Sequence, residues 1–131
     1  MNYLLDVNVL LAWGLDAHPH HHRVRRWLGS LKTKGATLCT TPITELGFLR
    51  VAAQPAYARH LSDGRRILES MRLAPGFTHT FIPDDLPGDR LPAWVLSPAQ
   101  TTDGHLLALA VRHHAKLATL DNGIPEAFII P

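Results

Sequence analysis

Four acidic residues in this chain of 131 residues have positions that suit them to hold a metal ion. Asp6 and Asp121 each directly follow a short apolar run typical of a buried strand, while Glu45 and Asp103 fall in the opening turns of two expected helices. Clustered carboxylates repel one another and lose hydration when buried. A hard divalent cation such as Mg²⁺ or Mn²⁺ relieves both costs because it takes oxygen ligands. The pattern therefore indicates metal-assisted hydrolysis of a phosphodiester, in which two such ions can clamp the phosphate and generate a hydroxide.

The apolar pattern predicts strands that alternate with helices. Strands are expected at 3–5, 36–40, 78–82, 116–120 and 128–130. Helices are expected near 9–13, 19–31, 42–53, 62–71 and 102–114, with Ser62 as the cap of the fourth. This alternation is typical of an α/β protein with a mainly parallel sheet. Since the carboxyl ends of parallel strands and the starts of the following helices share one edge, the four acids are expected to converge there.

Each acid also has an explanation that involves no chemistry. Glu45 and Asp103 carry the negative charge that a helix N-terminus favours, and Asp121 begins an Asp-Asn-Gly turn. Asp6 is harder to explain in this way, because an acid inside an apolar run needs a partner. At one edge of the sheet, the four together favour a metal site over four separate local roles.

Composition and charge narrow the class of protein. The chain has 13 Lys and Arg against 11 Asp and Glu, a net charge of +2 that permits a polyanionic partner without requiring one. Hydrophobic residues make up 46%, and the length suits a single domain over 1–131. One cysteine, Cys39, excludes an intramolecular disulfide and a Cys-rich zinc site. The apolar stretch 4–15 is broken by Asp6 and Asn8, so we expect no membrane span. The N-terminus lacks the basic head and small-residue cleavage site of an export leader, so we expect a cytoplasmic protein.

Histidines gather near the expected start of the second helix, at His18 and at the three consecutive positions His20, His21 and His22. Consecutive side chains fan out around a helix and do not meet at one ion, whereas a closed imidazole site needs converging ligands. We therefore expect a solvated helix entrance here and assign the cluster no metal.

Four segments resemble, in order, the four motifs of PIN-domain ribonucleases, and in particular the VapC-type toxins of bacterial toxin–antitoxin modules. They are 5–12 (LDVNVLLA), 41–46 (TPITEL), 102–110 (TDGHLLALA) and 118–121 (ATLD). The resemblance extends over residues 1–128. No single motif is specific, but the ordered set of four in a chain of this length is a strong signal.

The resemblance implies a PIN fold, in which helices flank a small parallel sheet of about five strands. It also implies endonucleolytic cleavage of RNA that depends on Mg²⁺ or Mn²⁺, a cognate antitoxin that holds the enzyme inactive, and a homodimer. By motif position the acidic tetrad is Asp6, Glu45, Asp103 and Asp121. Asp6 and Asp103 are the first candidates for metal ligands, and Asp121 is the next. Asn8 is expected to orient Asp6, and Thr119 to support the metal site or its water.

Two other functions remain open at this point. A phosphatase with Asp6 as nucleophile is disfavoured, since that chemistry usually has a second acid two residues later and Asn8 stands there. A catalytically silent domain that binds RNA or protein is disfavoured by the intact set of four acids. Cleavage of RNA in Mg²⁺, compared with hydrolysis of a small phosphomonoester, separates these functions.

Overall fold

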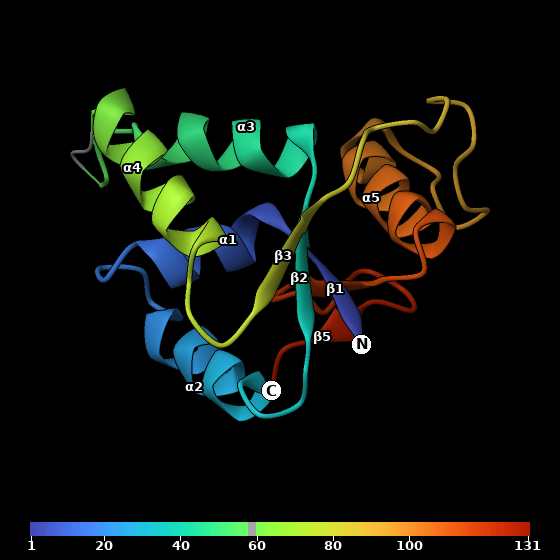
Figure 1. The fold of residues 1–131 in the computed structure, drawn as a ribbon. Helices are drawn as coiled ribbons and strands as arrows, with labels where there is room; N and C mark the ends of the chain where they lie inside the picture. Colours follow the sequence, from blue (N-terminus) through green and yellow to red (C-terminus); the bar gives the residue numbers. More distant parts are fainter. Residues whose placement is uncertain (58–59) are drawn as a thin grey trace.

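The computed structural model describes residues 1–57 and 60–131, and within them five parallel strands form one sheet (Figure 1). The strands are β1 (Asn2–Leu5), β2 (Thr37–Thr40), β3 (Thr78–Phe81), β4 (Lys116–Thr119) and β5 (Phe128–Ile129). The helices are α1 (Val7–Gly14), α2 (His21–Leu31), α3 (Pro42–Ala52), α4 (Leu61–Arg72) and α5 (Thr101–Arg112), with a short 3₁₀ helix, η1 (Pro98–Gln100), before α5. The predicted α/β class with a parallel sheet is confirmed.

The sheet has the order β3-β2-β1-β4-β5, so the first strand of the chain lies in the middle. Leu4 of β1 pairs with Cys39 of β2, and Leu5 pairs with Ala118 of β4. β1 is therefore hydrogen-bonded along both edges, to β2 and to β4, as suits a strand whose last three residues are all buried. Asp6 follows β1 directly and so emerges at the centre of the carboxyl edge.

Helices cover both faces of the sheet. Figure 1 shows α1, α2 and α4 to one side of it and α5 to the other. Alternate residues of a strand point to opposite faces, and β1 accordingly supplies two cores. Tyr3 and Leu5 pack in the core with α1 and α2, whereas Leu4 packs with Leu106 and Leu109 of α5. The described residues include no helix with the length and apolar composition needed to cross a membrane.

Local sequence explains where α3 begins. Thr41 is the N-cap, and Pro42 occupies the first helical position, where its missing N–H costs nothing. The Thr41 N–H donates to Oγ1 of Thr44 at 3.2 Å, which is the contact that the third helical residue makes to the N-cap backbone in a capping box. This start places Glu45 in the first turn, as predicted.

Two local predictions were wrong. Ser62 lies inside α4, and the cap is His60, whose N–H donates to the carboxylate of Asp63 at 3.3 Å. The histidine cluster is not fully solvated: His21 is buried, and its Nδ1 lies 2.7 Å from the carbonyl oxygen of Ala12. Successive residues of a helix point about 100° apart, so one of the three consecutive histidines turns into the core while its neighbours remain exposed.

Candidate active site

Asp6 joins β1 to α1 and is held from several directions. It caps α1, and its Oδ1 accepts a hydrogen bond from the Val7 N–H at 2.7 Å. Its own N–H donates to the carbonyl of Ala118 on β4 at 3.0 Å. The residue is 7% exposed, and this burial raises the pKa of its carboxyl. The hydrogen bonds from Thr119 and Val7 act in the opposite direction, and the charge of Asp121 raises the pKa further.

The buried hydroxyl of Thr119 links three of the predicted site residues. It donates to Oδ2 of Asp6 at 2.7 Å and accepts from the Asp121 N–H and from Nδ2 of Asn8, each at 3.1 Å. One donor and two acceptors are the full capacity of a hydroxyl. Oδ1 of Asn8 in turn accepts from the Leu120 N–H at 3.2 Å. Asn8 thus reaches Asp6 through Thr119.

Asp103 and Asp121 complete a group of three aspartates. Asp103 lies in the first turn of α5. Partial burial and then the charges of Asp6 and Asp121 raise the pKa of its carboxyl. Asp121 follows β4, is exposed, and accepts a hydrogen bond from the Gly123 N–H at 2.7 Å. The three carboxylates, from three separate elements, therefore lie near enough to repel one another.

This donor set fits a hard divalent cation, which prefers carboxylate oxygens and offsets the repulsion that raises these pKa values. Across 1–57 and 60–131, however, no three acidic, histidine or cysteine side chains are already drawn together as a metal cage. The aspartates share an edge of the sheet without closing around a centre. Such an arrangement suits an ion that keeps several waters, as Mg²⁺ does.

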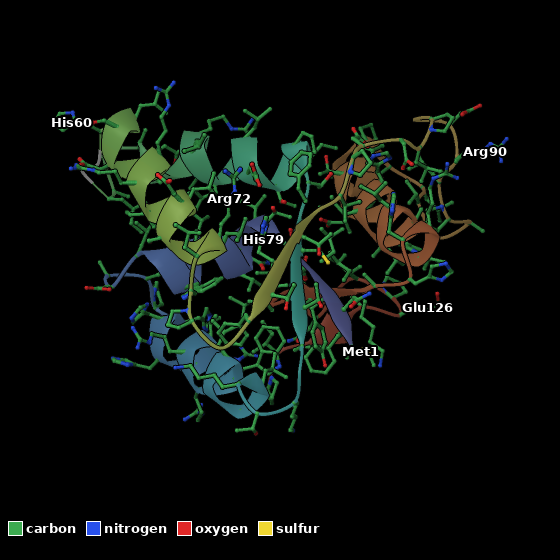
Figure 2. The ribbon with its side chains drawn as sticks, viewed as in Figure 1. Met1, His60, Arg72, His79, Arg90 and Glu126 are labelled. Carbon is green, nitrogen blue, oxygen red and sulfur yellow. The ribbon has the colours of Figure 1, made fainter. Side chains whose placement is uncertain are left out.

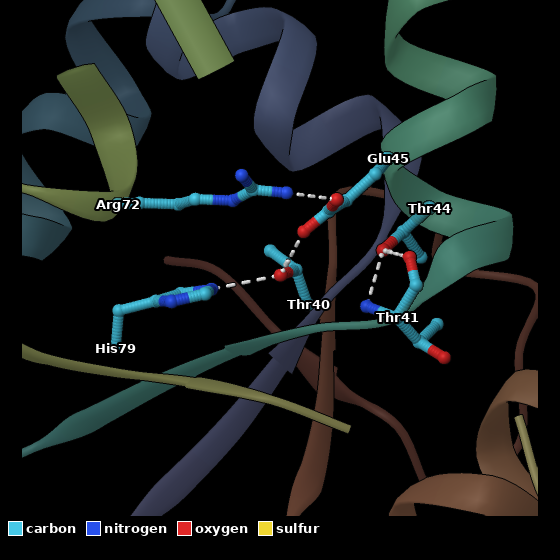
Figure 3. Close-up of polar contacts among 6 residues, drawn as sticks. All are labelled: Thr40, Thr41, Thr44, Glu45, Arg72 and His79. Atoms are coloured by element: carbon cyan, nitrogen blue, oxygen red, sulfur yellow. Dashed lines mark hydrogen bonds and ion pairs between the residues drawn. The ribbon is translucent and has the colours of Figure 1, made fainter. Parts of the chain in front are cut away.

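Glu45, the fourth predicted acid, has partners of its own. It is 8% exposed, and its Oε1 forms an ion pair with Nη2 of Arg72, the last residue of α4. Its Oε2 accepts a hydrogen bond from Oγ1 of Thr40 at 2.5 Å, and Nε2 of His79 lies 2.8 Å from the same hydroxyl. Figure 2 shows Arg72 and His79 directed into the space between α3, α4 and the sheet, and Figure 3 shows the four residues in contact.

Sequence reasoning named the acids but missed Thr40, Arg72 and His79. Thr40 is the last residue of β2. It could have been predicted as a site residue, because the last residue of a strand lies at the edge of the sheet where the acids were expected. Arg72 lies 27 residues after Glu45 and belongs to another helix. Nothing in local spacing marks an arginine at a helix end as the partner of a distant acid.

The loop between β3 and α5 is fastened to α5. Asp84 contacts Nε2 of His105 at 2.6 Å, and Asp85 contacts both His113 and Arg112. Gly104, directly after Asp103, lies so close to Val95 of this loop that any Cβ there would collide with it. The loop therefore packs against the turn that carries Asp103.

Comparison with known proteins places this geometry in a family. The family model described as "PIN domain" matches residues 3–128. Ribonuclease VapC38 of Mycobacterium tuberculosis is 41% identical over 92% of this chain and 86% of its own length. Ribonuclease VapC39 of the same organism is 35% identical over 97% of this chain and 94% of its length. A crystal structure of VapBC2 from Rickettsia felis, bound to a DNA fragment from their promoter, shares the fold, with a TM-score of 0.64 and 15% identity over 98% of this chain and 97% of that chain.

The five-stranded parallel sheet with helices on both faces agrees with these matches. Identity above one third extends over nearly the whole chain, well beyond the segments that carry the acids. The chain therefore belongs to the PIN-domain family, among the VapC ribonucleases.

Proposed function

We propose that this chain is the toxin of a toxin–antitoxin module and cuts RNA internally with the help of a divalent cation. Nucleases of this family generally depend on such an ion, and we propose Mg²⁺ or Mn²⁺ here, held by Asp6, Asp103 and Asp121. The observation that carries the proposal is the buried carboxylate of Asp6, held by Thr119 and the start of α1 beside two further aspartates. Residues 1–131 act as one domain in the cytoplasm.

The residues have separate tasks in this proposal. A divalent cation, when bound, lowers the pKa of the attacking water and offsets charge on the scissile phosphate. Thr119 donates its only hydrogen to Asp6, which keeps that carboxylate in one orientation. Asn8 supports Thr119, and the Asp121 N–H donates to the same hydroxyl, so that Asp6 and Asp121 keep a fixed relation. Glu45 is the fourth acid at the same edge, and its charge is paired with that of Arg72.

The proposed partners are RNA, a cognate antitoxin and a second copy of the chain. A group of carboxylates in a chain of slightly positive net charge attracts a basic side chain. An arginine from an antitoxin would form charge-assisted hydrogen bonds there and oppose cation binding. We expect expression of the chain alone to arrest growth and co-expression with the antitoxin to relieve it.

Purified protein, freed of the antitoxin, tests the activity directly. RNA should be cleaved in Mg²⁺ or Mn²⁺, and chelation with EDTA should abolish cleavage until the ion is restored. Full cleavage in EDTA would contradict the metal assignment. Hydrolysis of a small phosphomonoester without RNA cleavage would favour the Asp6-nucleophile phosphatase, and failure of both assays with folded, metal-loaded protein would favour a silent binding domain.

A further inference from the structure

Both carboxylate oxygens of Glu45 are already occupied by donors from the chain itself. Arg72 donates to Oε1, and the Thr40 hydroxyl donates to Oε2 (Figure 3). Asp6 is likewise occupied at both oxygens, by the Val7 N–H and the Thr119 hydroxyl, but those donors are uncharged. What sets Glu45 apart from Asp6, Asp103 and Asp121 is the positive charge of its donor Arg72. Within the described residues, none of these three aspartates forms an ion pair with a lysine or arginine. The four acids therefore divide into one acid that carries its own cation and three that do not.

The hydrogen bonds behind Glu45 have a fixed direction. A hydroxyl has one hydrogen, and Thr40 gives its hydrogen to Glu45, so the contact of 2.8 Å with His79 must have Nε2 as donor. The order is thus His79 to Thr40 to Glu45, with Arg72 on the other oxygen. This arrangement requires Glu45 to accept at both oxygens, which an ionised carboxylate does.

On its inner side, Arg72 leaves little space for a hydrated ion. Arg72, Thr40 and His79 border a cavity of about 10 Å³, whose other walls are mostly apolar side chains, among them Leu5 and Leu38. A volume of that size holds about one water molecule. The Arg72 guanidinium is paired with Oε1 of Glu45, and a dication approaching that oxygen would be repelled by it.

Arg72 also occupies a position that favours a cation. It is the last residue of α4, where the partial negative charge of a helix C-terminus stabilises a positive side chain. Its side chain is 38% exposed, whereas that of Glu45 is 11% exposed. The ion pair thus lies at the boundary between the core and the open edge of the sheet, with the acid on the inner side.

We propose that Arg72 takes the place of a second metal ion at Glu45, so that this nuclease binds one divalent cation, at the three aspartates. The inference rests on the proposed function and makes Arg72 a positioning residue. It neutralises Glu45 and, with Thr40, holds that carboxylate in one orientation. In such a nuclease the Arg72 guanidinium supplies, at Glu45, the positive charge that a second bound metal ion would otherwise supply.

The number of ions per chain tests this directly. Mn²⁺ is titrated into the full-length protein, freed of antitoxin, and free Mn²⁺ is followed by electron paramagnetic resonance. Only Mn²⁺ that excess Mg²⁺ displaces is counted. Mn²⁺ bound to histidines is excluded in this way, because imidazole groups bind Mg²⁺ poorly and Mg²⁺ does not displace it. Wild type should bind one ion. Arg72→Met, which keeps an apolar stem but removes the charge, should bind two, and the double variant Arg72→Met with Glu45→Gln should return to one.

Control variants separate the charge of Arg72 from its packing. Arg72→Lys keeps the charge and should bind one ion. Arg112→Met removes the matched arginine at the end of α5, whose partner is Asp85, and should also bind one. If Arg72→Met does not fold, Glu45→Gln decides, because it should still bind one ion with affinity close to wild type.

The outcomes distinguish this inference from the proposed function. Two displaceable ions in wild type, one ion in folded Arg72→Met, or loss of the single ion in Glu45→Gln would overturn the role of Arg72 and leave the metal-dependent nuclease intact. No displaceable Mn²⁺ in wild type would instead contradict the proposed function itself.

Discussion

Val7 of α1 and Gly47 of α3 meet so closely that a Cβ atom on Gly47 would lie 2.6 Å from Cγ2 of Val7. Val7 directly follows Asp6, and Gly47 follows Glu45 by two residues. The contact therefore sets the separation between the two helix starts that carry these acids. A side chain at position 47 must displace either the Val7 side chain or one of the two helices.

Gly47→Ala should destabilise the protein and slow RNA cleavage. Overpacking of this kind costs about 1–3 kcal/mol, and a shift of either helix would also separate Glu45 from Asp6. Urea denaturation and cleavage rates measure the two effects. Gly29→Ala on α2 is the matched control, because nothing lies within 4 Å of its Cβ position. That change should stabilise the helix by up to about 1 kcal/mol, and equal effects at both glycines would contradict this account.

Asp6→Asn and Asp103→Asn should abolish most of the cleavage while the protein remains folded. Each change removes a proposed metal ligand with little change of shape. Loss of a residue that only supports a metal ligand already lowers metal affinity or activity by about 10–100-fold. We therefore expect each of these two changes to lower the cleavage rate by at least the upper end of that range. Asp16→Asn serves as the control, since its side chain is 91% exposed. Similar losses in all three variants would mean that the site lies elsewhere.

Thr119→Val should reduce cleavage by about 10–100-fold, because valine keeps the shape of threonine but supports neither Asp6 nor Asn8 nor the Asp121 N–H. Thr119→Ser keeps the hydroxyl and should retain most of the activity. The apparent affinity for Mn²⁺ should fall in the valine variant along with the rate. Unchanged Mn²⁺ affinity with a reduced rate would show that Thr119 acts on the substrate and not on the metal ligands.

Asp103 should destabilise the metal-free protein at neutral pH. Burial and neighbouring charges raise the pKa of its carboxyl above the ordinary 3.8, so the folded state binds this proton more tightly than the unfolded state does. Stability from this group is therefore present at low pH and is lost as the pH rises through the raised pKa. In EDTA at pH 7, Asp103→Asn should melt at a higher temperature than wild type, and the difference should vanish below pH 3.8.

Added Mg²⁺ should reverse that order. A cation that binds only the folded state stabilises it by mass action, so Mg²⁺ should raise the melting temperature of wild type more than that of Asp103→Asn. The same increase in both proteins would show that Asp103 is not a metal ligand.

Much of the fold could be predicted because the signals are local. Short apolar runs mark the strands, and Thr41 with Pro42 marks the start of α3. The alternation of these elements implies a parallel sheet, whose carboxyl edge brings Asp6 and Asp103 near each other. The metal-ligand roles of these acids stay a prediction that the experiments above test.

The remaining contacts could not be predicted because they join residues far apart in the chain. Arg72 meets Glu45 only because α4 packs beside α3, and the angle between two helices leaves no mark in local spacing. His21 turns inward because of where α2 meets α1, at the carbonyl of Ala12. At His60, an acid at the third helical position determined the start of α4 in preference to the serine nearby.

The bond between Thr119 and Asp6 spans 113 residues of sequence and has a consequence for protein synthesis. β1 leaves the ribosome first, but β4, one of its two neighbours in the sheet, is among the last elements made. A nascent chain that ends before Thr119 cannot orient Asp6, and it also lacks Asp121. An enzyme that cuts RNA while its own messenger and ribosome are at hand would thus stay inactive until translation of its coding sequence is almost complete.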